Sequence, residues 1–186
     1  VDVSEADLST TVLGDRISFP VMASAAGGMW ETHPEGEVAV AKGAGAAGTL
    51  MALATGSSRS IVEVAKAASG PLWYQLYHMD DEVTEFQVAM AKEAGYSAIC
   101  LTVDGHGGRP KEKDMRNDFQ PRAKKGWADL HGRPDLQAKV ASRREQRYQG
   151  LAWSRLEWLR SLTGLPLVVK GILTAEDALL CVEHGA

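Results

Sequence analysis

Residues 94–101, AGYSAICL, hold the pattern that decides the fold: a helix end, a glycine and then an apolar run. The pattern returns at residues 47–53 (AGTLMAL) and 163–169 (TGLPLVV), and residues 183–186 (EHGA) begin it once more. Glycine ends a helix in the left-handed conformation, and a short apolar run without alternation is typical of a parallel strand buried on both faces. The sequence therefore predicts repeated strand–helix units, with a further strand expected after residue 186.

Five strands are predicted, at residues 19–23, 49–55, 72–77, 98–104 and 167–170. Helix starts are expected at His33-Pro34, at the capping box Ser60–Glu63, at Asp80 and at Thr174 with Asp177. Strands that alternate with helices indicate a parallel sheet, either open and doubly wound or closed as a (β/α)8 barrel. Residues 25–30, AAGGMW, lack the spacing of the dinucleotide-binding glycine motif, which weakens the doubly wound alternative.

The composition is that of one domain of 186 residues, of which 45% are hydrophobic. The sequence has no apolar run of the roughly 18 to 20 residues that a membrane span needs, and its acidic start does not resemble a signal peptide. Cys100 and Cys181 fall inside a predicted strand and a predicted helix, where cysteine is a small buried hydrophobe. A soluble, cytoplasmic protein is expected.

A basic block interrupts the strand–helix rhythm. Residues 109–147 contain twelve Lys or Arg against six Asp or Glu, although the whole chain carries a net charge of −4. Overlapping it, residues 120–150 are polar and hold Gly126, Gly132 and Pro134, so they are interpreted as a long excursion after the fourth strand. The block is either a solvated, mobile excursion or a surface that attracts an anion. It holds no nucleic-acid motif, and a helix over residues 151–162 leads back to the fifth strand.

Polar residues fall at the predicted carboxyl ends of the strands, where a barrel carries its site. They are Thr55, Gln75, Tyr77, Thr102, Asp104 and Lys170, and the segment Ala25-Ala26-Gly27 follows the first predicted strand at the same face. Buried polar groups need partners. Two readings stay open at this point: the groups pair with one another, as Lys170 could with Asp104, or they meet a planar cofactor above the barrel.

An ordered set of motifs resembles the FMN-dependent 2-hydroxy acid oxidase and dehydrogenase family, which includes glycolate oxidase, lactate oxidase and mandelate dehydrogenase. The motifs are PVM at 20–22, HPEGE at 33–37, AAGT at 46–49, QLY at 75–77, LTVD at 101–104, DMRN at 114–117, LPLVVKG at 165–171 and TAEDA at 174–178. The resemblance implies an α/β fold, a partial (β/α)8 barrel with strands 1–5 present and 6–8 absent. The resemblance covers nearly the whole chain outside residues 120–150, and it implies one partial barrel domain over residues 1–186, with 120–150 as the excursion, and bound FMN.

The resemblance also implies residue roles. FMN would lie against Ala25, Ala26, Gly27, Gln75, Thr102 and Lys170. Tyr77 would bind the substrate, and Lys111, with Arg109 nearby, would hold the substrate carboxylate. Asp104 would pair with the catalytic histidine, which the family supplies from a His-Gly-x-Arg motif expected beyond residue 186. Asp104, Tyr77 and Lys170 thus form the expected catalytic set within this chain.

Several positions depart from the family pattern. Ala25-Ala26-Gly27 replaces Pro-Thr-Ala, Ala54 replaces a serine, Gly56 replaces a tryptophan, and Lys111 replaces an arginine. The implied reaction is oxidation of a small L-2-hydroxy acid to the 2-oxo acid. The alternative is a non-catalytic barrel fragment, or a decayed enzyme, that acts only with a complementary chain. No metal site is predicted, His106 is a weak candidate for a substitute base, and the full-length protein is expected to be a homo-oligomer.

Overall fold

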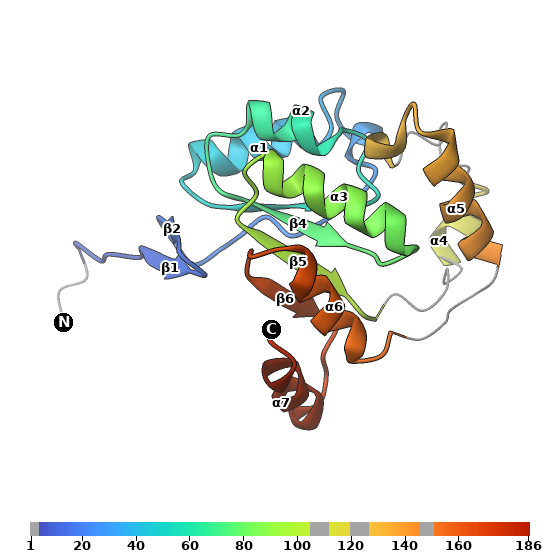
Figure 1. Ribbon diagram of the computed structural model, residues 1–186. Helices are drawn as coiled ribbons and strands as arrows, with labels where there is room; N and C mark the ends of the chain where they lie inside the picture. The colour runs from blue at the N-terminus through green and yellow to red at the C-terminus, as the bar shows by residue number, and fades with distance from the viewer. Residues whose placement is uncertain (1–3, 105–111, 120–126, 146–150) are drawn as a thin grey trace.

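The computed structural model describes residues 4–104, 112–119, 127–145 and 151–186, with residues 143–145 described as backbone only. Its centre is a four-stranded parallel sheet in the order β3-β4-β5-β6 (Figure 1). The strands are β3 (Met51–Ala54), β4 (Leu72–Leu76), β5 (Ala98–Thr102) and β6 (Leu167–Lys170). Neighbours in sequence are neighbours in the sheet, which is the order of a barrel rather than of a doubly wound sheet.

Helices follow the strands as the sequence predicts. They are α1 (Glu37–Ala46), α2 (Ile61–Ala67), α3 (Asp81–Glu93), α6 (Ser154–Leu162) and α7 (Ala175–Glu183). The capping box at Ser60 and Glu63 and the caps at Asp80 and Thr174 are confirmed, each side-chain oxygen accepting a backbone N–H of the first turn. These caps satisfy amides that have no partner inside the helix.

The main core lies between the sheet and helices α1, α2, α3 and α6. Along β4, Leu72, Tyr74 and Leu76 face this core, whereas Trp73 belongs to a second cluster with Leu50 and Ala98. Successive strand residues point to opposite faces. Gln75 therefore shares the Trp73 face, away from the helices.

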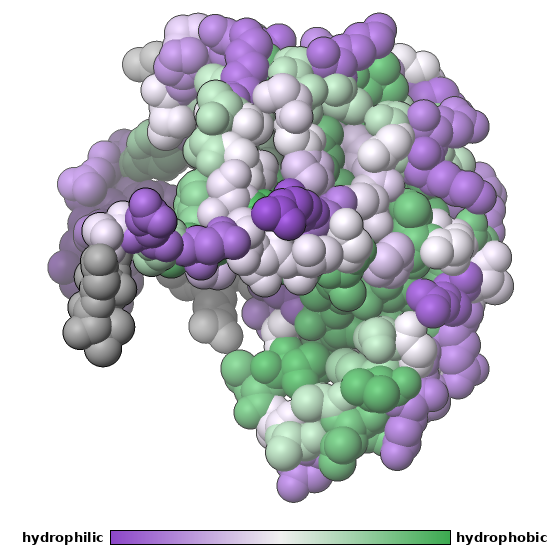
Figure 2. Space-filling model, turned by 90° about the vertical axis from the view of Figure 1, so that its left-hand side faces the viewer, coloured by the Kyte–Doolittle hydropathy of each residue, from purple (hydrophilic) through white to green (hydrophobic). Residues whose placement is uncertain are grey.

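Helix α7 carries apolar side chains into solvent. Leu173, just before it, is 93% exposed, and Leu179 and Val182 are 66% and 70% exposed. Figure 2 shows apolar surface in the lower part of the molecule, which is where Figure 1 draws α7. Exposed apolar patches usually mark surfaces that another segment or chain covers.

The prediction of a strand over residues 19–23 is wrong for every residue except Ala23. Only Ala23 pairs, through a parallel bridge to Met51 in which Ala23 N–H donates to Leu50 O at 3.0 Å. Pro20 has no N–H to give to a ladder, and the Val21 N–H turns back to Phe19 O at 2.8 Å. The first predicted strand is therefore reduced to the single bridge between Ala23 and Met51 at the edge of the sheet.

The predicted helix start at His33-Pro34 also needs correction, because α1 begins at Glu37. A short 3-10 helix, η1 (Met29–Glu31), comes first, and Gly36 precedes α1 with φ 56°. That backbone conformation favours glycine and breaks the helical path between Pro34 and Glu37.

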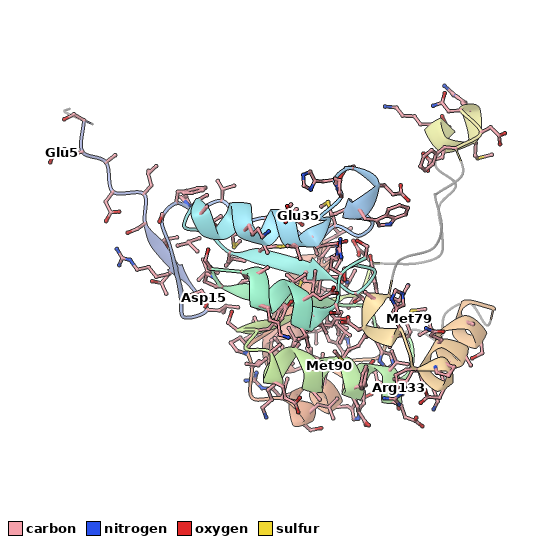
Figure 3. The ribbon with its side chains drawn as sticks, turned by 90° about the horizontal axis from the view of Figure 1, so that it is seen from above. Glu5, Asp15, Glu35, Met79, Met90 and Arg133 are labelled. Atoms are coloured by element: carbon pink, nitrogen blue, oxygen red, sulfur yellow. The ribbon has the colours of Figure 1, made fainter. Side chains whose placement is uncertain are left out.

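An antiparallel hairpin that was not predicted closes the amino-terminal end of the sheet. It consists of β1 (Thr10–Val12) and β2 (Asp15–Ile17). Asp15 Oδ2 accepts hydrogen bonds from Trp73 Nε1 at 2.9 Å and Ser97 Oγ at 2.6 Å, and Ile17 joins the Trp73 cluster. Asp15 is labelled beside this hairpin in Figure 3.

The basic block of residues 109–147 contains α4 (Glu112–Arg116), η2 (Ala128–Leu130) and α5 (Pro134–Glu145). Residues 112–119 have no buried side chain, whereas η2 and α5 pack against the rest of the molecule, so the block is not solvated throughout. Leu130, Leu136 and Val140 are buried against Val83 of α3. Figure 3 draws Met79 and Arg133 near each other at this contact, and the Arg133 guanidinium lies 5.0 Å from the Phe86 ring centroid. The four-residue spacing of Leu136 and Val140 was the signal for a helix.

For the described residues, no helix is long and apolar enough to cross a membrane.

Candidate functional site

Three polar side chains form a row across the carboxyl ends of adjacent strands. Gln75 lies near the end of β4, Thr102 ends β5 and Lys170 ends β6, with Thr102 and Lys170 in register. Gln75 Nε2 donates to Thr102 Oγ1 at 2.9 Å, and both residues are 3% exposed. Gln75 and Thr102 lie at the strand ends, as the sequence predicts, and here they pair with each other.

Thr55, which directly follows β3, connects Gln75 of this row to the neighbouring strand β3 through hydrogen bonds. Its Oγ1 donates to Gln75 O at 2.6 Å and accepts from Tyr77 N–H at 2.9 Å. The Thr55 amide also donates to Gln75 O at 3.0 Å. Thr55 is fully buried, so it fixes the backbone on both sides of Leu76. Tyr77 follows directly and is 38% exposed, with its ring available at the rim.

Lys170 and Asp104 pair with each other at the rim. Lys170 Nζ lies 3.3 Å from Asp104 Oδ1, and the two side chains are 44% and 48% exposed. The charge of Lys170 also acts on Cys100: burial raises the pKa of that thiol, and the lysine partly offsets the rise. An exposed pair of this kind contributes about 0 to 1 kcal/mol, so either member can change partner at little cost.

The segment Ala25-Ala26-Gly27 lies against the loop after β3. Ala25 is half-buried, and Ala26 and Gly27 are exposed. A Cβ on Gly27 would stand 2.9 Å from Gly56 O, too close for an ordinary contact. The two departures from the family pattern at Gly27 and Gly56 are therefore in contact, and it is the missing side chain of Gly27 that lets the loops approach, because an added Cβ on Gly56 would meet no atom within 4 Å.

Several predicted residues lie outside the described parts of the chain. They are Arg109 and Lys111, expected at the substrate carboxylate, and His106, the candidate substitute base. Within the residues that are described, no group of three or more His, Cys, Asp or Glu side chains could hold a metal ion.

Two buried carboxylates were missed by sequence reasoning. Glu37 is fully buried and Asp129 is 6% exposed, and each contacts the loop that leads from β3 into α2. Asp129 Oδ1 accepts the Ile61 N–H at 2.7 Å. Burial raises the pKa of Asp129 to about 6, with that hydrogen bond opposing the rise and the charge of Glu63 adding to it. Neither contact could be predicted from nearby sequence, because Glu37 binds Ser58, which is 21 residues away, and Asp129 binds Ile61, which is 68 residues away.

The parallel sheet and its helices define a partial (β/α)8 barrel, with the row of polar side chains at its carboxyl face. The model of the FMN-dependent dehydrogenase family matches residues 1–186. The chain belongs to the FMN-dependent dehydrogenase family.

Named relatives agree with this assignment. Glycolate oxidase 3 of Arabidopsis thaliana is 40% identical over 197 residues, which cover 100% of this chain and 53% of the relative. A soluble mutant of (S)-mandelate dehydrogenase from Pseudomonas putida superposes with a TM-score of 0.87 at 33% identity, covering 100% of this chain and 54% of that one. Mandelate oxidase with benzoyl-formic acid gives a TM-score of 0.81 at 33% identity, covering 100% and 51%. The chain thus spans about half the length of these relatives.

The residues present fit the family's cofactor. A flavin ring needs hydrogen-bond donors and acceptors along one edge, and a glutamine amide with a threonine hydroxyl offers both. Gln75 and Thr102 stand side by side at the strand ends, and Lys170 brings a cation to the same edge.

Proposed function

We propose that the full-length protein binds FMN at the row Gln75, Thr102 and Lys170 and oxidises a small L-2-hydroxy acid to the 2-oxo acid. The observation that carries the proposal is the contact of Gln75 Nε2 with Thr102 Oγ1, which brings an amide and a hydroxyl together at the end of two adjacent strands beside Lys170. The names of the relatives, glycolate oxidase and mandelate oxidase among them, supply the substrate class.

FMN, when bound, would supply the acceptor for a hydride equivalent. Gln75 and Thr102 would orient the flavin edge, exchanging their mutual hydrogen bond for bonds to the ring. Lys170 would leave Asp104 and place its charge where negative charge develops during reduction. The segment Ala25-Ala26-Gly27 would bound the other side of the ring.

The substrate would be held by Tyr77 through its hydroxyl and by a cation through its carboxylate. Tyr77 stands at the rim next to the fixed Thr55–Gln75 unit, which limits its movement. Lys111, with Arg109 two residues away, is the proposed carboxylate partner. Asp104 would stabilise the protonated form of a histidine base once Lys170 has turned to the flavin.

The test is reconstitution of the full-length protein with FMN, followed by assay with glycolate, L-lactate and L-mandelate. We expect 2-oxo acid formation above a free-FMN control, and single-turnover bleaching of the flavin absorbance by the substrate. A protein that binds FMN yet is not bleached by any of these acids would support the alternative of a non-catalytic or decayed member. A protein that does not bind FMN would refute the proposal.

We propose a cytoplasmic location and self-association of the full-length protein as well. The two cysteines, Cys100 and Cys181, are both free and buried, which suits a reducing compartment. The apolar surface of α7 suits coverage by further polypeptide. Fractionation of cells that express the tagged protein and light scattering of the purified protein test the two statements.

A further inference from the structure

Glu37 is a fully buried carboxylate in the first turn of α1, yet its side chain serves two loops rather than the helix. Its Oε1 accepts the Met29 N–H at 3.3 Å and the Ser58 N–H at 3.0 Å, and its Oε2 accepts the Ser58 hydroxyl at 2.6 Å. Met29 belongs to the segment after the Ala23 bridge, and Ser58 belongs to the loop after β3. One side chain therefore joins the carboxyl-side loops of two neighbouring strand–helix units.

The backbone around Glu37 is shaped for this contact. A Cβ on Gly36 would stand 3.0 Å from Ser58 Oγ and 3.3 Å from Trp30 N, so glycine lets the helix start approach both loops. The same loops touch again at Gly27 and Gly56, where an added Cβ would be 2.9 Å from Gly56 O. Segment 27–31 and loop 56–58 are thus held at two points, one a glycine contact and one a carboxylate.

We propose that Glu37 is a positioning residue for the flavin. It fixes segment 27–31 against loop 56–58 and so sets the position of the adjoining Ala25-Ala26-Gly27 segment, which is the proposed FMN contact. This inference rests on the proposed function for the ligand, while the tie between the loops stands on the contacts alone. A buried carboxylate that accepts three hydrogen bonds holds its three donors together, and its loss leaves two amides and a hydroxyl without this partner.

The geometry predicts a graded set of variants in the full-length protein. Glu37→Ala removes every acceptor, and Glu37→Asp withdraws the carboxylate by one methylene. Glu37→Gln keeps one oxygen for the two amides, and its Nε2 can donate to Ser58 Oγ after the hydroxyl rotates. We expect the dissociation constant of FMN to rise about tenfold or more in the Ala and Asp variants and to stay within about threefold in the Gln variant.

Asp129→Ala is the matched control. Asp129 is also a buried carboxylate that accepts an amide of the same connection, at Ile61, but it does not touch segment 27–31. Its loss should lower the melting temperature to a similar degree and leave FMN affinity within about threefold of the wild type. A loss of FMN affinity in Asp129→Ala as large as in Glu37→Ala would show that general destabilisation, and not positioning, is the cause.

Amide hydrogen exchange of the apoprotein separates the loop tie from the cofactor. Exchange should accelerate at Met29 and Ser58 in Glu37→Ala, whereas Asp129→Ala should accelerate exchange at Ile61 and leave Met29 unchanged. Unchanged exchange at Met29 and Ser58 in Glu37→Ala would overturn the inference. A wild-type protein without FMN affinity would refute the proposed function and the flavin part of the inference, while accelerated exchange would still support the tie.

Discussion

Lys170 Nζ lies 3.3 Å from Asp104 Oδ1, so the charge at the end of β6 is balanced by a residue two positions after the end of β5. Gly171 makes this approach possible, because a Cβ at that position would stand 2.6 Å from Asp104 Cβ. Both charged side chains remain about half exposed. The pair is therefore a rim contact that a ligand can replace.

Replacing Lys170 with Met in the full-length protein should impair reduction more than binding. The removed cation acts on charge that develops during reduction, whereas the ring contacts hold both redox states. We expect flavin reduction by substrate to slow by about 10²-fold, with the melting temperature nearly unchanged since the ion pair is exposed. Photoreduction spectra should show less of the anionic reduced flavin. Unchanged redox behaviour would contradict the assignment of Lys170.

Gly171→Ala should displace Asp104 and lower stability by about 1 to 3 kcal/mol. The cause is double: φ at Gly171 is 111°, and the new methyl group would overlap Asp104. Gly185→Ala is the matched control, since φ there is 91° and no atom lies within 4 Å of the added Cβ. Thermal unfolding of both variants separates the overlap from the backbone strain. Equal losses in the two would show that the Asp104 contact costs nothing.

Lys111→Ala should raise the KM for the hydroxy acid with a smaller effect on kcat, if Lys111 meets the substrate carboxylate. A charge-assisted hydrogen bond is worth about 1.5 to 3 kcal/mol, which corresponds to a rise in KM of roughly tenfold or more. Arg109→Ala should do less. Steady-state kinetics decide between them, and a larger effect at Arg109 would move the carboxylate contact by two residues.

Asp129 should make stability depend on pH in the direction opposite to an ordinary ion-paired aspartate. Its pKa is raised from 3.8 to about 6 in the folded protein, so the folded form holds the proton more tightly than the unfolded form does. The contribution of this pKa difference to the free energy of unfolding is fully present below about pH 4 and is lost as the pH rises through about 6. The loss amounts to at most about 3 kcal/mol.

Asp129→Asn removes this titration and keeps an oxygen for the Ile61 amide. The wild-type melting temperature minus that of Asp129→Asn should therefore fall as the pH is raised from 4 to 7. Thermal unfolding at several pH values measures the difference. A difference that is constant, or that grows with pH, would mean that Asp129 is ionised throughout this range.

Residues 1–186, expressed alone, should self-associate. Leu173, Leu179 and Val182 expose apolar surface, and no described strand pairs with the outer edge of β6. Light scattering should report species larger than a monomer, and Leu179→Ser with Val182→Ser should reduce them. A monomer with a cooperative thermal transition would contradict this prediction.

The sequence by itself determined the repeating unit and most of its boundaries. The glycine and apolar run at residues 163–169 places β6, and the caps at Ser60, Asp80 and Thr174 mark helix starts, because these signals act between residues a few positions apart. The predicted strands also placed Gln75 and Thr102 at one edge, because each lies at or near the end of its strand and parallel strands end together.

Only the tertiary structure decided the contacts between distant residues. Ala23 pairs with Met51 at a single bridge, Glu37 joins Met29 to Ser58, Asp129 reaches Ile61 across 68 residues, and α5 packs on α3. A charged residue in a polar stretch carries no local sign that it will be buried, because its burial depends on amide donors that other elements bring to it. The sequence set which residues end each strand, and the packing of the loops set what those ends can hold.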